Sequence, residues 1–111
     1  MVHLLVVHAQ ATGENSVAIG GAQDGTLANK AGTAAKATGN QSIALGTKSN
    51  ATGVNATAIG TGAQATHDNA IALGAGSATK MAIPNKSDTF FGKTYTYAGG
   101  SPSSVVSIGS A

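Results

Sequence analysis

The sequence predicts an all-β protein, a parallel β-roll (a short-repeat β-solenoid) with one inserted hairpin or loop. Three observations support this prediction. A short phrase recurs at residues 41–46, 55–60 and 69–74, so that its closing glycines, Gly46, Gly60 and Gly74, are evenly spaced. Within each copy, large and small residues alternate, which is the pattern of a β-strand. Glycine ends every copy, and a fixed short period indicates one unit stacked on copies of itself.

Each repeat unit reads as two short strands joined by two turns. The recurring phrase is one strand, and a small-polar-small run, such as residues 49–51 or 63–65, is the other. Glycine supplies the positive φ that tight turns need. At about 3.3 Å per residue the path of one unit is at most about 46 Å long, so it encloses an interior one side chain deep. Stacked units would pair like strand with like strand in parallel.

The larger aliphatic residues of each phrase occupy alternate positions, and we expect them to fill this interior, since such residues suit a half-buried strand. The expected internal core is Val17, Ile19, Ile43, Leu45, Ile59, Ile71, Leu73, Val106 and Ile108. The residues between them are uniformly small and would then face outward. They are Ala18, Ala44, Ala58 and Ala72. Because parallel sheets are normally covered on both faces, we predict a subunit interface along this alanine column, although an alanine-rich composition would also explain it.

The first clear copy of the phrase spans residues 14–20. Its closing glycine, Gly20, precedes Gly46 by slightly less than two full periods, which leaves room for one shortened unit. The stretch between carries Asn29 and Ala31 where aliphatic residues should stand. We therefore expect a weak coil around residues 25–36; the alternative is that part of this stretch loops out.

A single domain is expected, with roll coils over residues 1–78, an insertion over 79–104 and a return to the roll over 105–111. The insertion holds both prolines and all four aromatic residues of the chain. Two strand-like runs flank Gly92-Lys93, the pattern of a hairpin. In repeat proteins such insertions lie in loops on one face.

Composition limits the classes of function. The chain has 111 residues, a net charge of +2 and no cysteine. This charge is too small for a nucleic-acid footprint, the missing cysteine excludes thiolate metal sites, and no apolar run is long enough to span a membrane. We therefore expect neither nucleic-acid binding nor direct membrane contact by this chain. Few large apolar residues per coil leave little burial to offset the entropy of folding, so self-association is expected.

No catalytic chemistry is predicted. The acidic residues share no repeat column, and the histidines lack the spacing of metal ligands. His67 replaces a repeat glycine and is interpreted as a surface turn residue. The glycines match neither the dinucleotide nor the P-loop pattern. We expect no catalytic residue, no metal and no cofactor, and hence no enzyme.

The phrase Asn-Ser-Val-Ala-Ile-Gly, followed by small-polar-small and Ala-Thr-Gly and repeated at a constant interval, resembles the YadA-like head of trimeric autotransporter adhesins. Matching copies occur at residues 15–20, 41–46, 55–60, 69–74 and 104–109, and the run from Tyr95 to Ser110 looks like the head-insert motif of that family. The resemblance implies a left-handed roll and a homotrimer. It also implies a place on the surface of a Gram-negative bacterium, attached to the outer membrane through segments outside this chain.

The function implied is adhesion to host cells or extracellular-matrix proteins. Candidate contact residues are the outward polar positions and the insertion, where exposed aromatic side chains would make good anchors. They are Lys36, Asn50, Gln64, Lys86, Phe90, Phe91, Lys93, Tyr95 and Tyr97. The aromatic residues could instead brace the insertion against a neighbouring chain. A passive spacer in a surface fibre is the alternative function; an ice-binding solenoid would need a second rank of threonines, and a β-helical polysaccharide enzyme would need clustered acids.

Overall fold

The computed structural model describes residues 9–21, 34–82, 87–90, 93–96 and 101–109. These residues form short strands and turns, with no helix among them. The strands are β1 (Gln10–Ala11), β2 (Val17–Ile19), β3 (Lys36–Ala37), β4 (Ile43–Leu45), β5 (Asn50–Ala51), β6 (Thr57–Ile59), β7 (Gln64–Ala65), β8 (Ile71–Leu73), β9 (Ser87–Phe90), β10 (Lys93–Thr96) and β11 (Val106–Ile108).

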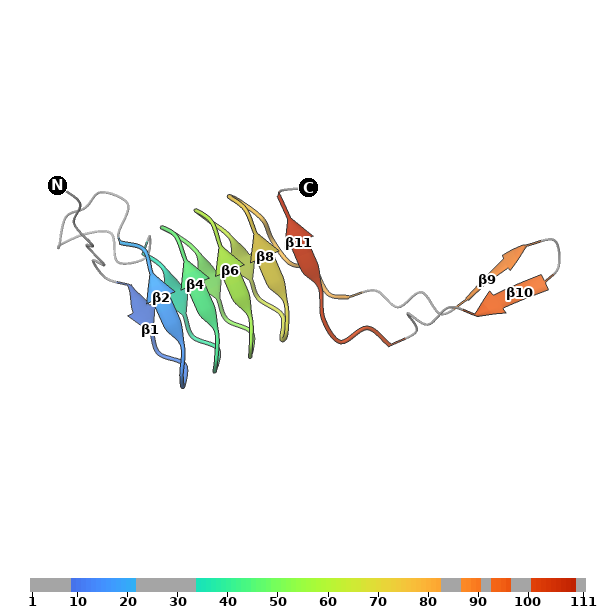
Figure 1. Ribbon diagram of the computed structural model, residues 1–111, viewed down its shortest axis with the longest axis horizontal. Coiled ribbons are helices and arrows are strands. Elements are labelled where there is room, and N and C mark those ends of the chain that lie inside the picture. The colour runs from blue at the N-terminus through green and yellow to red at the C-terminus, as the bar shows by residue number, and fades with distance from the viewer. Residues whose placement is uncertain (1–8, 22–33, 83–86, 91–92, 97–100, 110–111) are drawn as a thin grey trace.

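Successive coils stack along one axis and build two parallel sheets (Figure 1). One sheet has the order β1-β3-β5-β7, and the other has the order β11-β8-β6-β4-β2. Equivalent residues of neighbouring coils face each other in register, so that Ile43 pairs with Thr57 and Thr57 with Ile71. The predicted fold class, an all-β parallel roll of short coils, is confirmed.

No weak coil separates the first unit from the regular array. β2 pairs directly with β4, Val17 opposite Ile43, and β1 pairs directly with β3. The coil is closed by a hydrogen bond from the Ala35 amide to the Gly20 carbonyl at 2.9 Å. The expectation of a coil around residues 25–36 is therefore wrong, because neither sheet has a place for its strands. Most of that stretch, residues 22–33, lies outside the described residues.

The exposure of the two alternating columns is also the reverse of what we expected. Ala44, Ala58 and Ala72 are fully buried inside a single coil stack. Ile43 and Leu45 keep 40% and 39% of their surface exposed. The same outward placement holds for Val17, Ile19, Ile71, Leu73, Val106 and Ile108, while Ile59 is half-buried. The predicted aliphatic core and the predicted alanine interface are both wrong: Ala18, like the other three alanines, belongs to the interior cluster.

The reason for this reversal is the width of the coil. Alternation defines two faces of a strand but does not say which one lies inside. In each regular coil the interior is lined by small residues, for example Ala51, Ala56, Ala58 and Ala63. Two walls joined by such short corners lie too close for branched side chains, and overfilling a packed interior is destabilising. The aliphatic side chains therefore face outward.

Buried serines take alanine positions in this interior and are satisfied there. The Ser42 hydroxyl donates to the Gly39 carbonyl at 2.6 Å, and the Ser49 hydroxyl donates to the Gly46 carbonyl at 2.6 Å. A buried hydroxyl is costly only without a partner, and these bonds reach the backbone of the same corner. Serine can thus replace alanine at these interior positions without widening the coil.

One corner of each coil, here called the asparagine corner (residues 39–41, 53–55 and 67–69), has a left-handed residue. Asn55 and Asn69 both have a φ of 58°, and the Asn55 side-chain amide donates to the Asn69 Oδ1 at 3.2 Å. Asparagine tolerates this conformation better than other residues with a Cβ. This explains why the phrase so often opens with asparagine, a preference that the sequence alone does not explain.

Glycine at this corner is required by the closeness of successive coils. A Cβ added at Gly53 would collide with the carbonyl oxygen of His67 in the next coil. His67 itself stands in the glycine column of the last complete coil. After Thr79 the chain leaves the coil path, so a side chain is accommodated there; the His67 Nδ1 lies 3.2 Å from the Thr79 Oγ1.

The insertion contains the predicted hairpin, but the predicted turn at Gly92-Lys93 is one residue too late, because Lys93 already belongs to β10. β9 and β10 pair antiparallel, with Phe90 opposite Lys93. Figure 1 shows this hairpin away from the coil stack. β11 then pairs in parallel with β8, Val106 opposite Ile71, so the chain returns to the roll in the register of the repeat.

Candidate functional site

The roll presents two opposite faces. Alanines from both sheets point into one interior cluster, so the outward side chains of the two sheets lie on opposite sides of the stack. We call the outward side of β2, β4, β6, β8 and β11 the aliphatic face. Its members are Val17, Ile19, Ile43, Leu45, Thr57, Ile59, Ile71, Leu73, Val106 and Ile108. We call the outward side of β3, β5 and β7 the polar face, with Lys36, Asn50 and Gln64.

The aliphatic face is a continuous apolar surface. Its two columns run across the strands of one sheet and contain no charged residue. Exposure rises from 37% at Ile71 to 77% at Ile108 on the last strand. A contiguous apolar patch on a soluble protein marks an interaction site, whereas apolar residues scattered singly do not. The two aligned rows of this face form such a patch.

The polar face carries a ladder of hydrogen-bonding side chains. Lys36 stands opposite Asn50, and Asn50 opposite Gln64, on neighbouring strands. The Asn50 side-chain amide donates to the Gln64 Oε1 at 3.4 Å. A hollow of about 330 Å³ opens here, lined by Ala34, Lys36, Lys48, Ser49, Asn50 and Gln64. The structure thus brings together the three predicted contact residues of the roll.

The predicted contact residues of the insertion are placed differently. Phe90, Lys93 and Tyr95 lie on the β9–β10 hairpin, where Tyr95 pairs with Asp88. Lys86, Phe91 and Tyr97 lie outside the described residues. The hairpin is separate from the polar face along the chain and in Figure 1.

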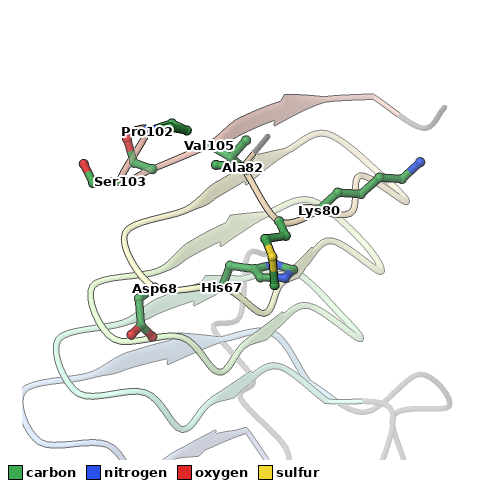
Figure 2. A pocket seen from close by; sticks show the side chains of 9 residues that line it. His67, Asp68, Lys80, Ala82, Pro102, Ser103 and Val105 are labelled. Carbon is green, nitrogen blue, oxygen red and sulfur yellow. The ribbon is translucent and has the colours of Figure 1, made fainter. Parts of the chain in front are cut away.

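A second hollow, of about 190 Å³, lies where the insertion leaves and rejoins the roll. Figure 2 shows His67 and Asp68 on the coil side, with Lys80, Ala82, Pro102, Ser103 and Val105 on the two chain segments above. The Asp68 Oδ1 accepts a hydrogen bond from the Val54 amide at 2.9 Å, so this carboxylate is part of the corner ladder. His67 lies in a turn, as the sequence indicated.

Metal-binding clusters and membrane-spanning helices are both missing from the residues that the structure describes. No group of three histidine, cysteine, aspartate or glutamate side chains in this part of the chain could hold a metal ion. None of its segments is a helix of the length and apolar character that a membrane crossing needs.

Lys48 is a residue of the polar hollow that the sequence reasoning missed. It has a φ of 64°, whereas its equivalents in the next two coils are Gly62 and Gly76, with φ of 75° and 70°. Stacked hydrogen bonds from the Gly62 amide to the Thr47 carbonyl and from the Gly76 amide to the Thr61 carbonyl, each 2.9 Å, show that these corners are equivalent. The repeat spacing could have identified this residue, because position 48 holds a lysine where the next two repeats have glycine.

Comparison with known proteins gives one match. The family model of the YadA head domain repeat (2 copies) matches residues 7–22, 31–49 and 51–77. Together these segments cover more than half of the chain. The gap between the first two segments lies within residues 22–33, which are outside the described residues. No curated protein and no solved structure matches the chain.

Proposed function

The chain belongs to the family of YadA head domain repeats, a family of trimeric autotransporter adhesins at the cell surface, and we propose that its aliphatic face closes the trimer while its polar face meets host macromolecules. The observation that carries the proposal is the pair of exposed aliphatic columns on the β2–β11 sheet. This assignment replaces the alanine column that the sequence suggested. It keeps the homotrimer that the family implies.

The aliphatic face supplies the free energy that the interior lacks. An interior of alanine and serine buries little apolar surface per coil. Full burial of a valine, leucine or isoleucine is worth about 1.5–3 kcal/mol, so covering a side chain that is still about 40% exposed adds roughly 1 kcal/mol. Two such residues per coil, repeated along the stack, favour association of like surfaces. Three copies around one axis would cover this face on every chain.

Adhesion is proposed for the surfaces that remain outside. With the aliphatic faces turned inward, the polar faces and the insertions would point to solvent. Lys36, Asn50 and Gln64 would then be presented three times, and avidity would strengthen weak single contacts with host cell-surface or extracellular-matrix proteins. The insertion residues from Lys86 to Tyr97 are proposed as a second contact region. Attachment to the outer membrane is assigned to other segments of the protein.

Leu45→Lys tests the trimer interface. A lysine in the middle of the aliphatic face would bury a charge without a partner, so the variant should elute as a monomer. Light scattering after gel filtration should give about three times 10.7 kDa for the wild type and about 10.7 kDa for the variant. Gln64→Lys on the polar face is the matched control and should stay trimeric. A folded wild-type monomer, or a trimeric Leu45→Lys variant, would contradict the proposed interface.

A passive spacer is the second candidate function. The coils of the roll stack along one axis, as they would in a rod segment within a fibre (Figure 1). A screen of the trimer against extracellular-matrix proteins separates the two functions. Binding that is lost on changing the polar face or on deleting residues 80–103 supports the adhesin; a trimer that binds no matrix protein or host cell supports the spacer.

A further inference from the structure

The polar hollow contains a residue held in a conformation that its type avoids. Lys48 adopts a φ of 64° at a corner where the repeat places glycine. A left-handed conformation is uncommon for residues other than glycine, asparagine and aspartate, and such outliers cluster at functional sites. Here the lysine side chain is exposed and lines the hollow. The position thus combines an unfavourable backbone with a gain in positive charge.

A second lysine lies on the same surface. Lys36 is exposed on β3 and lines the same hollow of about 330 Å³. Among the residues that the structure describes, no acidic side chain contributes to this lining. We name the surface formed by Lys36, Lys48, Asn50 and Gln64 the lysine groove.

The acidic side chains of the described coils gather elsewhere. Asp68 belongs to the asparagine corner and Glu14 to the equivalent corner of the first unit, at the other end of the strands from Lys48. The Asp68 carboxylate is held there because its Oδ1 accepts from the Val54 amide at 2.9 Å, and the backbone amide of Glu14 donates to the Asn40 Oδ1 at 3.0 Å. Opposite charges are therefore segregated to the two corners of the coil. Among the described coil residues the lysine groove therefore holds an excess of positive charge, which attracts anions.

The neutral members of the groove define the ligand further. The exposed Gln64 side chain carries donors and an acceptor, and Asn50 adds the donors of its side-chain amide, which matches hydroxyl groups that also donate and accept. They stand in register on parallel strands about 4.8 Å apart, so the recognition groups follow the stack axis. Among the described residues of the lining, Ala34 is the sole aliphatic one and it is buried, so the groove has no pocket of large apolar side chains to receive one from a peptide.

We propose that the lysine groove binds a linear sulfated polysaccharide, with Lys36 and Lys48 on sulfate groups and Asn50 and Gln64 on sugar hydroxyls. This inference rests on the proposed adhesin function and gives its polar face a ligand class. The groove lies on the side of the roll opposite the aliphatic face, so the trimer leaves it open. The three grooves of one trimer face outward in three directions, so separate segments of the polysaccharide can bind at the same time, and avidity makes weak single contacts sufficient.

Heparin is the probe, bound by the full chain as a trimer. Lys48→Gly removes the charge and installs the residue that the equivalent corners carry, so the roll should unfold at the same temperature or higher. Lys36→Gln removes the other charge from an exposed strand position. Each should lower the affinity for heparin by about threefold, the scale of one exposed ion pair. Lys80→Gln, which removes an exposed lysine outside the groove, is the matched control and should bind as the wild type does.

Two further probes distinguish the ligand chemistry. Desulfated heparin keeps the sugar hydroxyls without most of the charge, and polyglutamate keeps the charge without the sugar. The proposal expects heparin to bind more tightly than either. It is overturned if heparin binds no better than desulfated heparin, if polyglutamate binds as well as heparin, or if Lys80→Gln weakens binding as much as Lys48→Gly. A wild-type trimer that binds matrix proteins but not heparin would overturn this inference alone. A monomeric wild type would instead contradict the proposed assembly.

Discussion

At the scale of single residues, side-chain volume decides which positions a coil accepts. The interior takes alanine and serine, the asparagine corner takes asparagine in a left-handed conformation, and Gly53 lies where the next coil leaves no room for a Cβ. These demands recur in every coil because the same backbone path recurs. The hydrophobicity of a residue matters less here than whether its volume fits between two close walls.

Ala58→Leu should destabilise the roll by about 2–3 kcal/mol, since its larger side chain overfills an interior that is already closed. Ala58 is fully buried, whereas Ala78, which stands opposite Gln64 in the outward column of the polar face, is exposed. Ala78→Leu is therefore the control and should change the free energy of unfolding by less than about 0.5 kcal/mol. Urea denaturation of the two variants measures this difference, and equal stabilities would argue that the interior is wider than described.

Gly53→Ala and His67→Ala compare two members of one column. The added Cβ at residue 53 meets the backbone of the following coil, so we expect a loss of more than about 2 kcal/mol in the free energy of unfolding. His67 already has a Cβ, and truncating it should cost less than about 1 kcal/mol, the worth of a part-exposed hydrogen bond. Thermal unfolding checks both, and a tolerated Gly53→Ala would show that the coils can move apart.

At the scale of elements, the coil closes in the same way whether or not extra residues are inserted. The bond from the Ala35 amide to the Gly20 carbonyl is 2.9 Å, and the equivalent bond from the Ser49 amide to the Gly46 carbonyl is 3.0 Å. The first unit reaches this closure although β2 and β4 lie further apart in the chain than β4 and β6 do. The difference between these two spacings equals the number of residues in the stretch 22–33.

Deletion of residues 22–33 should therefore leave the roll intact. It joins Gly21 to Ala34, and Val17 would then precede Ile43 by the same interval at which Ile43 precedes Thr57. The shortened chain should keep its β-sheet circular dichroism. Its unfolding temperature should be equal or higher, since a shorter connection between Gly21 and Ala34 loses less entropy on closure. A deletion variant that does not fold would mean that these residues supply contacts the roll needs.

At the scale of the whole molecule, the two faces of the roll differ in the partner they can take. The aliphatic face suits a like surface, and the polar face with its lysine groove suits a hydrophilic ligand. This division follows from the narrow coil, because a side chain that cannot fit inside must be covered from outside or remain in water. The proposed assembly and the proposed binding therefore use different sheets, so that a change on one face should leave the other function in place.

Folding linked to trimer formation should make stability depend on protein concentration. A lone chain has an interior of small residues only, so the trimer should contribute much of the free energy of folding. We expect the unfolding temperature of the wild type to rise on each tenfold increase in concentration, and that of Leu45→Lys to stay constant. Scanning calorimetry over a hundredfold range makes the comparison. A constant wild-type value would indicate that the single roll is stable alone.

The period, the strands and the family could be predicted from the amino-acid order, because a strict recurrence is visible without coordinates. The hairpin could be predicted from its two strand-like runs, although the sequence places its turn one residue too late, and the loss of a repeat glycine at His67 could be predicted from the spacing. Which side of each strand lies inside could not. Ile43 and Ala44 alternate identically whether the coil is wide or narrow, and hydrophobicity favoured the wrong answer. The separation of the two walls, a property of the closed coil, placed Ala44 inside and Ile43 outside, on the aliphatic face.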